Sequence, residues 1–248
     1  MQINTIFYIC LKYGKNINFP YLRKGYIMNK YIAIIGDLIQ SKKIENRNVF
    51  QENLKQIFNN LNKKYKETII SNFTLTIGDE FQAILKLDNN LMKILDELYL
   101  LIPHEFRIGI GYGEISTQIN PILSIGSDGE AFWYARAAIE YIYNNNYSGR
   151  SNIYFKSEEE DIDEIINTIF LLSETIKDQW TDLQKETFQA MLNEDIYKEN
   201  FNQQNLAKKM KISQSSLSKR LSLGNIKIYL HARNQITKIL EDNYEYVE

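Results

Sequence analysis

The sequence contains a single cysteine, Cys10, and only two histidines, His104 and His231. One cysteine cannot form an internal disulfide, and these three residues are too few for a zinc site built from cysteine and histidine. A chain without disulfides fits a reducing compartment, so we expect a cytoplasmic protein. The 248 residues are long enough to bury a core, as one large domain or as a medium domain with a smaller one.

Long hydrophobic runs are also absent. The first 27 residues contain one short apolar run, residues 6–11, with no basic segment before it and no small-residue cleavage site after it. This segment therefore predicts neither a signal peptide nor a membrane span, and we expect no membrane association. Because Met28 leads directly into a strand pattern, we expect residues 1–27 to be a poorly ordered extension before the native start. An additional N-terminal strand is the alternative.

Acidic residues are missing from residues 203–238, although the whole chain has a formal charge of −2. This stretch carries eight basic residues: Lys208, Lys209, Lys211, Lys219, Arg220, Lys227, Arg233 and Lys238. The remainder therefore holds 21 basic and 31 acidic residues, a formal charge of −10. Positive charge gathered in one region is the electrostatic pattern that a polyanionic partner requires.

The pattern of residues 28–157 predicts one α/β domain. Its order is strand, helix, hairpin, helix, strand, helix, strand, which is typical of an α/β (α+β) sandwich of the ferredoxin-like kind with a mixed sheet. We expect the strands at residues 31–35, 73–77, 81–85, 106–115 and 152–155, and the helices at residues 48–65, 90–102 and 128–144. The glycines of residues 106–115 indicate a strand that another group approaches closely.

The remaining residues predict an all-α region. Residues 158–178 begin with an acidic run suited to a helix N-terminus and are expected to form a helical linker. Residues 179–248 are expected to form a helix-turn-helix domain that binds DNA, within which an amphipathic helix at residues 183–192 leads into the basic segment. A longer helix is expected after Gly224, packed on the preceding helix or on a second copy in a homodimer.

The DNA-binding prediction rests on the segment QQNLAKKMKISQSSLSKRLSLGN. Apolar residues occupy the buried positions of a helix, a tight turn and a second helix: Leu206, Ala207, Met210, Ile212, Leu217 and Leu221. Ser213 can cap the second helix. Outward positions of that helix hold the residues predicted to contact DNA: Gln214, Ser215, Ser216, Ser218, Lys219 and Arg220.

Within this set, Gln214 and Ser215 are expected to read bases, and Lys219 and Arg220 to contact phosphates. The alternative is a solvated basic face on an ordinary helical subdomain. Lys211 occupies the turn position where many such motifs carry glycine, which leaves the turn geometry open.

A second candidate site contains carboxylates of the α/β domain. Asp37 follows the first strand, and Asp79 with Glu80 lies at the hairpin. Converging carboxylates can hold Mg²⁺ and, through it, nucleotide phosphates, while Gly36 and Gly78 would let a phosphate approach the backbone. From spacing alone the simpler interpretation is stronger, because Gly-Asp is a common turn dipeptide and an aspartate after a strand often caps the next element.

The segments IIGDLIQ, TLTIGDEFQAIL, FRIGIGYGEIS and DGEAFWYARAAI resemble, in order and approximate spacing, the core motifs of nucleotidyl cyclases of the adenylate/guanylate and GGDEF groups. The resemblance implies that Asp37 and Asp79 bind Mg²⁺ or Mn²⁺. It also implies a nucleotide contacted by Gly36, Gly78, Glu80, Arg107 and Arg136. The chain departs from the adenylate/guanylate pattern at Phe132, where asparagine is usual, and at Leu75, where a substrate-selecting lysine is expected.

From Met28 onward the chain resembles the SatD family, through YIAIIGDLIQSKKI, TIGDEFQ, GIGYGEIST, GSDGEAFWYAR and KISQSSLSKRL. The expected function is a cytoplasmic DNA-binding transcriptional regulator whose cyclase-like domain senses a nucleotide or metal. The two departures favour nucleotide binding over turnover, because they remove transition-state contacts. The alternatives are a metal-dependent nucleotidyl cyclase-like enzyme, a catalytically degenerate nucleotide-binding protein, and a scaffold that binds neither ligand.

Overall fold

A computed structural model describes residues 29–76, 79–145, 147 and 149–244. The predicted N-terminal extension and Gly78 lie outside the described residues. Within them, five strands form one sheet: β1 (Lys30–Leu38), β2 (Ile69–Leu75), β3 (Glu80–Leu85), β4 (Phe106–Glu114) and β5 (Ile153–Lys156). The helical elements are η1 (Ser41–Lys43), α2 (Arg47–Lys64), α3 (Leu91–Leu101), α4 (Glu130–Asn145), α5 (Glu160–Lys177), α6 (Asp182–Asn193), α7 (Gln203–Lys209), α8 (Gln214–Leu223) and α9 (Ile226–Asn243).

The strand order in the sheet is β2-β3-β1-β4-β5. The pairs β2–β3, β1–β3 and β1–β4 are antiparallel, whereas β4 and β5 are parallel and are connected through α4. The prediction of an α/β fold with a mixed sheet is therefore confirmed. At the end of β1, Asp37 lies opposite Glu80 of β3 on one side and Arg107 of β4 on the other.

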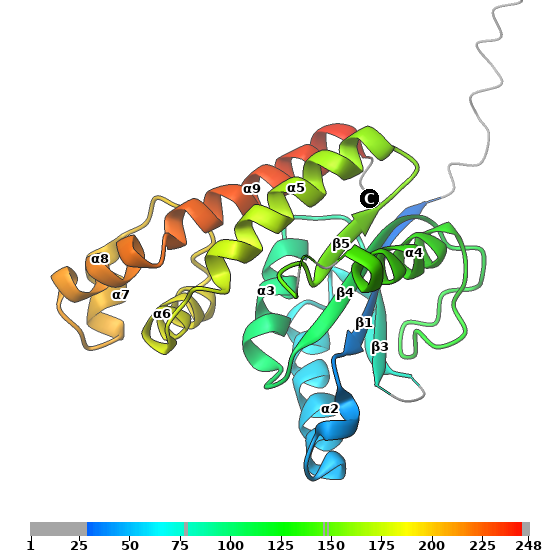
Figure 1. The fold of residues 1–248 in the computed structure, drawn as a ribbon, viewed down its shortest axis with the longest axis horizontal. Helices are drawn as coiled ribbons and strands as arrows, with labels where there is room; N and C mark the ends of the chain where they lie inside the picture. Colours follow the sequence, from blue (N-terminus) through cyan, green and yellow to red (C-terminus); the bar gives the residue numbers. More distant parts are fainter. Residues whose placement is uncertain (1–28, 77–78, 146, 148, 245–248) are drawn as a thin grey trace, which may run out of the picture.

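Both faces of the sheet are covered by helices (Figure 1). Alternation along β1 places Ile32 and Ile34 in the larger core, which α2, α3, α5 and α9 complete, while Ala33 and Ile35 face α4. The larger core includes Ile166 and Phe170 of α5. The segment predicted as a linker, residues 158–178, therefore contributes side chains to the core beneath the sheet.

The glycines of β4 accommodate α4. A Cβ atom added at Gly111 would lie 2.0 Å from the carbonyl oxygen of Ala131, and one added at Gly109 would lie 2.1 Å from that of Ala135. The group that approaches this strand closely is therefore the backbone of a helix. Gly36 has a similar role on the opposite face, because a Cβ atom there would lie 2.0 Å from the ring of Phe81.

A second core lies among α6, α7, α8 and the first half of α9. Trp180 packs on Phe188 and Tyr229, with ring centres 4.9 and 5.0 Å apart, and its indole N–H donates to the carbonyl oxygen of Gly224 at 2.6 Å. Helix α9 joins the two cores, because its first half carries Tyr229 and Leu230 into the second core and its last turns carry Ile236 and Leu240 into the first. Figure 1 shows α5 and α9 running side by side along this connection.

Candidate functional sites

The residues predicted to contact DNA lie on α8, which follows α7 after a four-residue turn. Lys211, in this turn, has a φ of 56°, the left-handed conformation that usually favours glycine. Ser213 is the N-cap of α8, and its hydroxyl accepts a hydrogen bond from the backbone N–H of Ser216 at 3.1 Å. The turn is therefore formed with a lysine in the glycine position, and the predicted cap is confirmed.

Helix α8 has one buried face and one exposed face. Leu217 and Leu221 are 0% and 3% exposed and belong to the second core, together with Leu206 and Ala207 of α7. Met210 and Ile212 pack against the same core and are partly buried. The opposite face leaves five of the predicted contact residues exposed to solvent: Gln214, Ser215, Ser216, Ser218 and Lys219. Arg220 is half-buried, and its Nη1 lies 3.1 Å from Oε2 of Glu186 on α6.

The positive charge near α8 is smaller than the eight basic residues of the sequence indicate. Arg233 is 1% exposed, so its charge is not presented to solvent, while Lys209 is paired with Glu194. Three exposed lysines of α7, the turn and α8 make no ion pair within the described residues: Lys208, Lys211 and Lys219. The exposed face of α8 is thus mildly basic and mostly neutral polar.

At the end of β1, the middle strand of the sheet, Asp37 is held by two side chains on the face that α4 covers. Arg107 Nη1 lies 3.2 Å from Asp37 Oδ2, and the hydroxyl of Tyr143 on α4 donates to the same oxygen at 2.6 Å. The Arg107 guanidinium lies 4.2 Å from the centre of the Tyr143 ring. The hydrogen bond to Asp37, with burial, raises the pKa of Tyr143 above its ordinary value, so Tyr143 stays a donor at neutral pH.

Asp79 lies beside this site, but its carboxylate has other partners. It accepts hydrogen bonds from the Ser41 hydroxyl and from the Arg47 guanidinium, which lie at η1 and at the start of α2. Each predicted metal aspartate therefore has its own arginine, Arg107 for Asp37 and Arg47 for Asp79. Within the described part of the chain, no group of three or more His, Cys, Asp and Glu side chains could hold a metal ion.

No contact joins the other predicted nucleotide-binding side chains, Glu80 and Arg136, to Asp37 among the interactions of the described residues. Glu80 is exposed, and Arg136 is exposed on α4. Phe132, which occupies the position where cyclases carry a polar residue, is 0% exposed and packs between α4 and the sheet.

A family model described as "SatD family" matches residues 31–240, from the first strand of the sheet to the last turns of α9. The chain belongs to the SatD family. The matched residues include both the sheet and the α7–α8 pair. A search of curated proteins finds no match. Among the described helices, none has the length and apolar character needed to cross a membrane.

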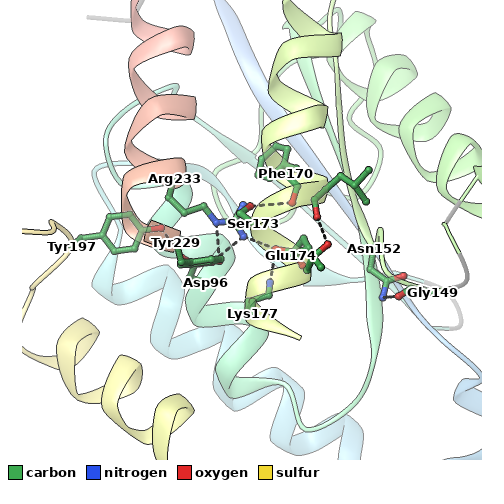
Figure 2. Close-up of polar contacts among 12 residues, drawn as sticks. Asp96, Gly149, Asn152, Phe170, Ser173, Glu174, Lys177, Tyr197, Tyr229 and Arg233 are labelled. Carbon is green, nitrogen blue, oxygen red and sulfur yellow. Dashed lines mark hydrogen bonds and ion pairs between the residues drawn. The ribbon is translucent and has the colours of Figure 1, made fainter. Parts of the chain in front are cut away.

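The structure also contains a buried ionic cluster that the sequence patterns did not predict (Figure 2). Its centre is Arg233 of α9, which donates to Oε1 of Glu174 at 2.7 Å, to Oδ1 of Asp96 at 3.2 Å, and to the Tyr229 hydroxyl at 2.7 Å. Lys177 donates to Glu174 at 2.7 Å. The cluster therefore connects α3, α5 and α9 beneath the junction of the two cores.

The charges of this cluster balance. Burial alone would raise the pKa of Glu174, but the ammonium of Lys177 and the guanidinium of Arg233 outweigh it and hold that pKa below its ordinary value. A sequence signal for the cluster exists in the spacing of Tyr229, Arg233, Ile236 and Leu240, which places the arginine on the buried stripe of α9. An arginine on such a stripe is expected to need buried acidic partners.

Proposed function

We propose that this protein is a DNA-binding regulator in which α7 and α8 form a helix-turn-helix and α8 enters the major groove. The observation that carries the proposal is the exposed polar face of α8, which lies opposite Leu217 and Leu221 and faces away from the rest of the chain. The ten residues of α8 span about 15 Å. The diameter of an α-helix with its side chains, about 10–12 Å, fits a major groove about 12 Å wide.

Three exposed lysines on and before α8 would supply the phosphate contacts. Lys208, Lys211 and Lys219 make no ion pair within the described residues, so their binding to phosphate does not require the loss of an internal partner. Gln214 and Ser215, in the first turn of α8, are the proposed base contacts, because the N-terminal residues of a recognition helix reach base edges. Two copies of α8 in a homodimer would read two half-sites one helical turn apart.

The test is the salt dependence of binding to a random-sequence duplex, measured by fluorescence anisotropy. Each phosphate contact contributes about −0.9 to the slope of log affinity against log salt, so Lys208→Ala, Lys211→Ala and Lys219→Ala combined should make the slope shallower by about 2.7. The control replaces three exposed lysines at the sheet domain, Lys42, Lys43 and Lys63, with alanine. No binding at low salt, or an equal effect of both triple variants, contradicts the proposal.

For the α/β domain we propose a ligand-sensing role at Asp37, with Mg²⁺ or Mn²⁺ and a nucleotide as ligand. The strand order β2-β3-β1-β4-β5, with β1 antiparallel to both neighbours, supports the ferredoxin-like and cyclase-like interpretation of the sequence. A metal at this site has to compete with Arg107 for Asp37 and with Arg47 for Asp79. We do not propose turnover, because Phe132 offers no polar group and is fully buried.

Calorimetry with Mn²⁺ and each nucleoside triphosphate tests this role. Asp37→Asn should abolish the binding heat, whereas Asp88→Asn, at a carboxylate beyond the far end of β3, should leave it unchanged. Absence of binding heat with every triphosphate removes the sensing role and leaves the DNA-binding proposal untouched.

A further inference from the structure

One side of α5 carries an apolar stripe that the larger core leaves partly exposed. Its members recur every three or four positions: Ile162, Ile165, Ile169, Leu172 and Ile176. This spacing keeps them on one side of the helix, beside the stripe that carries Ile166 and Phe170 into the larger core. Ile165 is 49% exposed and Leu172 is 63% exposed. Alternating steps of three and four residues are typical of the seam through which a helix packs on another helix.

Helix α9 lies beside α5 and runs antiparallel to it (Figure 1). The hydroxyl oxygens of Tyr244 and Ser157 are 2.7 Å apart at the sheet end of the pair. Toward the other end, Arg233 donates to Glu174 at 2.7 Å. Since these contacts set the relative position of the two helices, Leu172 lies level with the middle of α9.

The stripe of α9 that adjoins α5 is uncharged as well. Ile239, like Ile169 of α5, is partly buried and packs against the larger core, to which both helices contribute. Helical spacing continues the stripe of Ile239 through Gln235, Ala232 and Ile228. Ile228 is 58% exposed, and Ala232 is half-buried. The two stripes together form an uncharged surface along both helices, the α5–α9 face.

The α5–α9 face is large enough for a dimer interface. Each of the two helices has 18 residues, which corresponds to a length of about 27 Å. Two helices with axes about 8–10 Å apart are together about 18 Å wide, so the footprint is about 500 Å² per copy. Two copies therefore bury about 1,000 Å², which reaches the lower limit for a specific interface.

We propose that the α5–α9 face binds a second copy of this chain, with α5 of each copy packed on α9 of the other. The two helices are complementary in size, because the exposed Leu172 of α5 lies level with the small Ala232 of α9. Their rims carry opposite charges in Glu164 of α5 and Lys238 of α9, which are both exposed. The ion pairs that α5 and α9 make within the described residues involve other side chains. A rim pair of this kind sets the orientation of two copies more than their affinity.

The proposed arrangement has its two-fold axis parallel to the helices, so α8 of both copies lies at the same end. Reading two half-sites requires this placement, and in that respect the inference rests on the proposed function. At the sheet end both helices carry an acidic residue, Asp161 and Asp242, which would repel each other. The closest packing is therefore expected nearer α8, among Leu172, Ile176 and Ile228.

Sedimentation equilibrium of the full chain, without DNA, tests the interface. At micromolar concentration the mass should be twice the 29.2 kDa of one chain. Leu172→Glu places a carboxylate in the interface twice, so it should raise the dissociation constant of the dimer at least about hundredfold. The matched control is Val49→Glu, because Val49 is 61% exposed on α2 and lies outside the α5–α9 face. Thermal unfolding establishes that both variants are folded.

Oxidative crosslinking in a Cys10→Ser background tests the arrangement of the two copies. An equimolar mixture of Leu172→Cys and Ala232→Cys should form disulfide-linked dimers, whereas neither variant alone should do so. Three results overturn the proposal: the full chain is a monomer at micromolar concentration; Leu172→Glu and Val49→Glu weaken the dimer equally; or Leu172→Cys crosslinks to itself and not to Ala232→Cys. Because none of these measurements contains DNA, their failure leaves the test of DNA binding by α8 unaffected.

Discussion

The acid-free stretch of residues 203–238 contributes basic residues to two very different environments. At α8, Lys219 is exposed and has no ion-pair partner within the described residues. Fourteen positions later, Arg233 is 1% exposed and lies between Asp96 and Glu174, which come from α3 and α5. The two residues contribute equally to the formal charge, but only Lys219 contributes to the field that a polyanion would meet.

The difference follows from the position of each residue on its helix. Lys219 lies on the side of α8 opposite Leu217 and Leu221, whereas Arg233 lies on the stripe of α9 that continues from Tyr229 to Ile236 and Leu240. A basic residue on a buried stripe is stable only if carboxylates meet it there. A run of basic residues therefore indicates a binding surface only if the residues at exposed positions, without the buried ones, are still predominantly basic.

The largest expected effect on stability comes from replacing the buried arginine. Arg233→Ala leaves Asp96 and Glu174 without their guanidinium partner, so it should reduce the free energy of unfolding by about 3–5 kcal/mol in urea titrations. Lys238→Ala, at an exposed position of the same helix, should change it by less than about 0.5 kcal/mol. If both variants lost a similar amount of unfolding free energy, the proposed difference between buried and exposed basic residues would be contradicted.

The second effect concerns pH. Because the pKa of Glu174 is lowered in the folded state, its stabilising contribution is complete above the ordinary value of 4.5 and is lost as the pH falls through the lowered pKa. Glu174→Gln should therefore lower the free energy of unfolding by about 1.5–3 kcal/mol at neutral pH. In this variant the free energy of unfolding should also fall less steeply as the pH is lowered. Urea unfolding across this range measures both. Glu164→Gln, exposed on the same helix, should retain the acid dependence of the unchanged protein.

A smaller effect is expected in the turn before α8. Lys211 has a φ of 56°, which costs a residue with a side chain about 1–2 kcal/mol relative to glycine. Lys211→Gly should therefore stabilise the protein by about 1 kcal/mol, measured by urea unfolding. Lys208→Gly, within α7, should have the opposite sign and destabilise it by about 1 kcal/mol. Destabilisation by both substitutions would mean that the side chain of Lys211 matters more than its backbone.

The smallest effect on stability is expected at the exposed face. Lys219→Ala should change the free energy of unfolding by less than about 0.5 kcal/mol. If α8 binds DNA as proposed, the same substitution should make the salt slope of DNA binding shallower by about 1. An unchanged slope with unchanged stability would leave Lys219 as an ordinary solvated side chain.

The predicted elements agree with the structure because their signals are local. The hairpin predicted at residues 73–77 and 81–85 corresponds to the antiparallel pair β2 and β3, although β2 begins earlier than predicted, at Ile69, and ends at Leu75. The strand predicted at residues 106–115 corresponds to β4. The glycines of β4 predicted a close approach, but a strand alone cannot identify what approaches it. The approaching group is the backbone of α4, which arrives through the crossover between β4 and β5.

The partners of the side chains in the candidate sites could not be predicted from the spacing of residues in the sequence. Asp37 and Asp79 lie near each other at adjacent strand ends, as the motifs indicated, but their carboxylates turn to Arg107 and Arg47 respectively. Alternation along a strand determines the face of each side chain, and the partner on that face comes from elsewhere in the chain. The buried cluster was missed for the same reason, since Asp96 and Arg233 are 137 positions apart.

The sequence by itself determined the order of strands and helices, the mixed α/β class, the Ser213 cap and the burial of Leu217 and Leu221, because hydrophobic periodicity and capping act within a few residues. Tertiary structure alone decided which basic residues are neutralised and which arginine meets each aspartate. Those outcomes depend on Coulomb interactions and desolvation between groups that only the folded chain brings together.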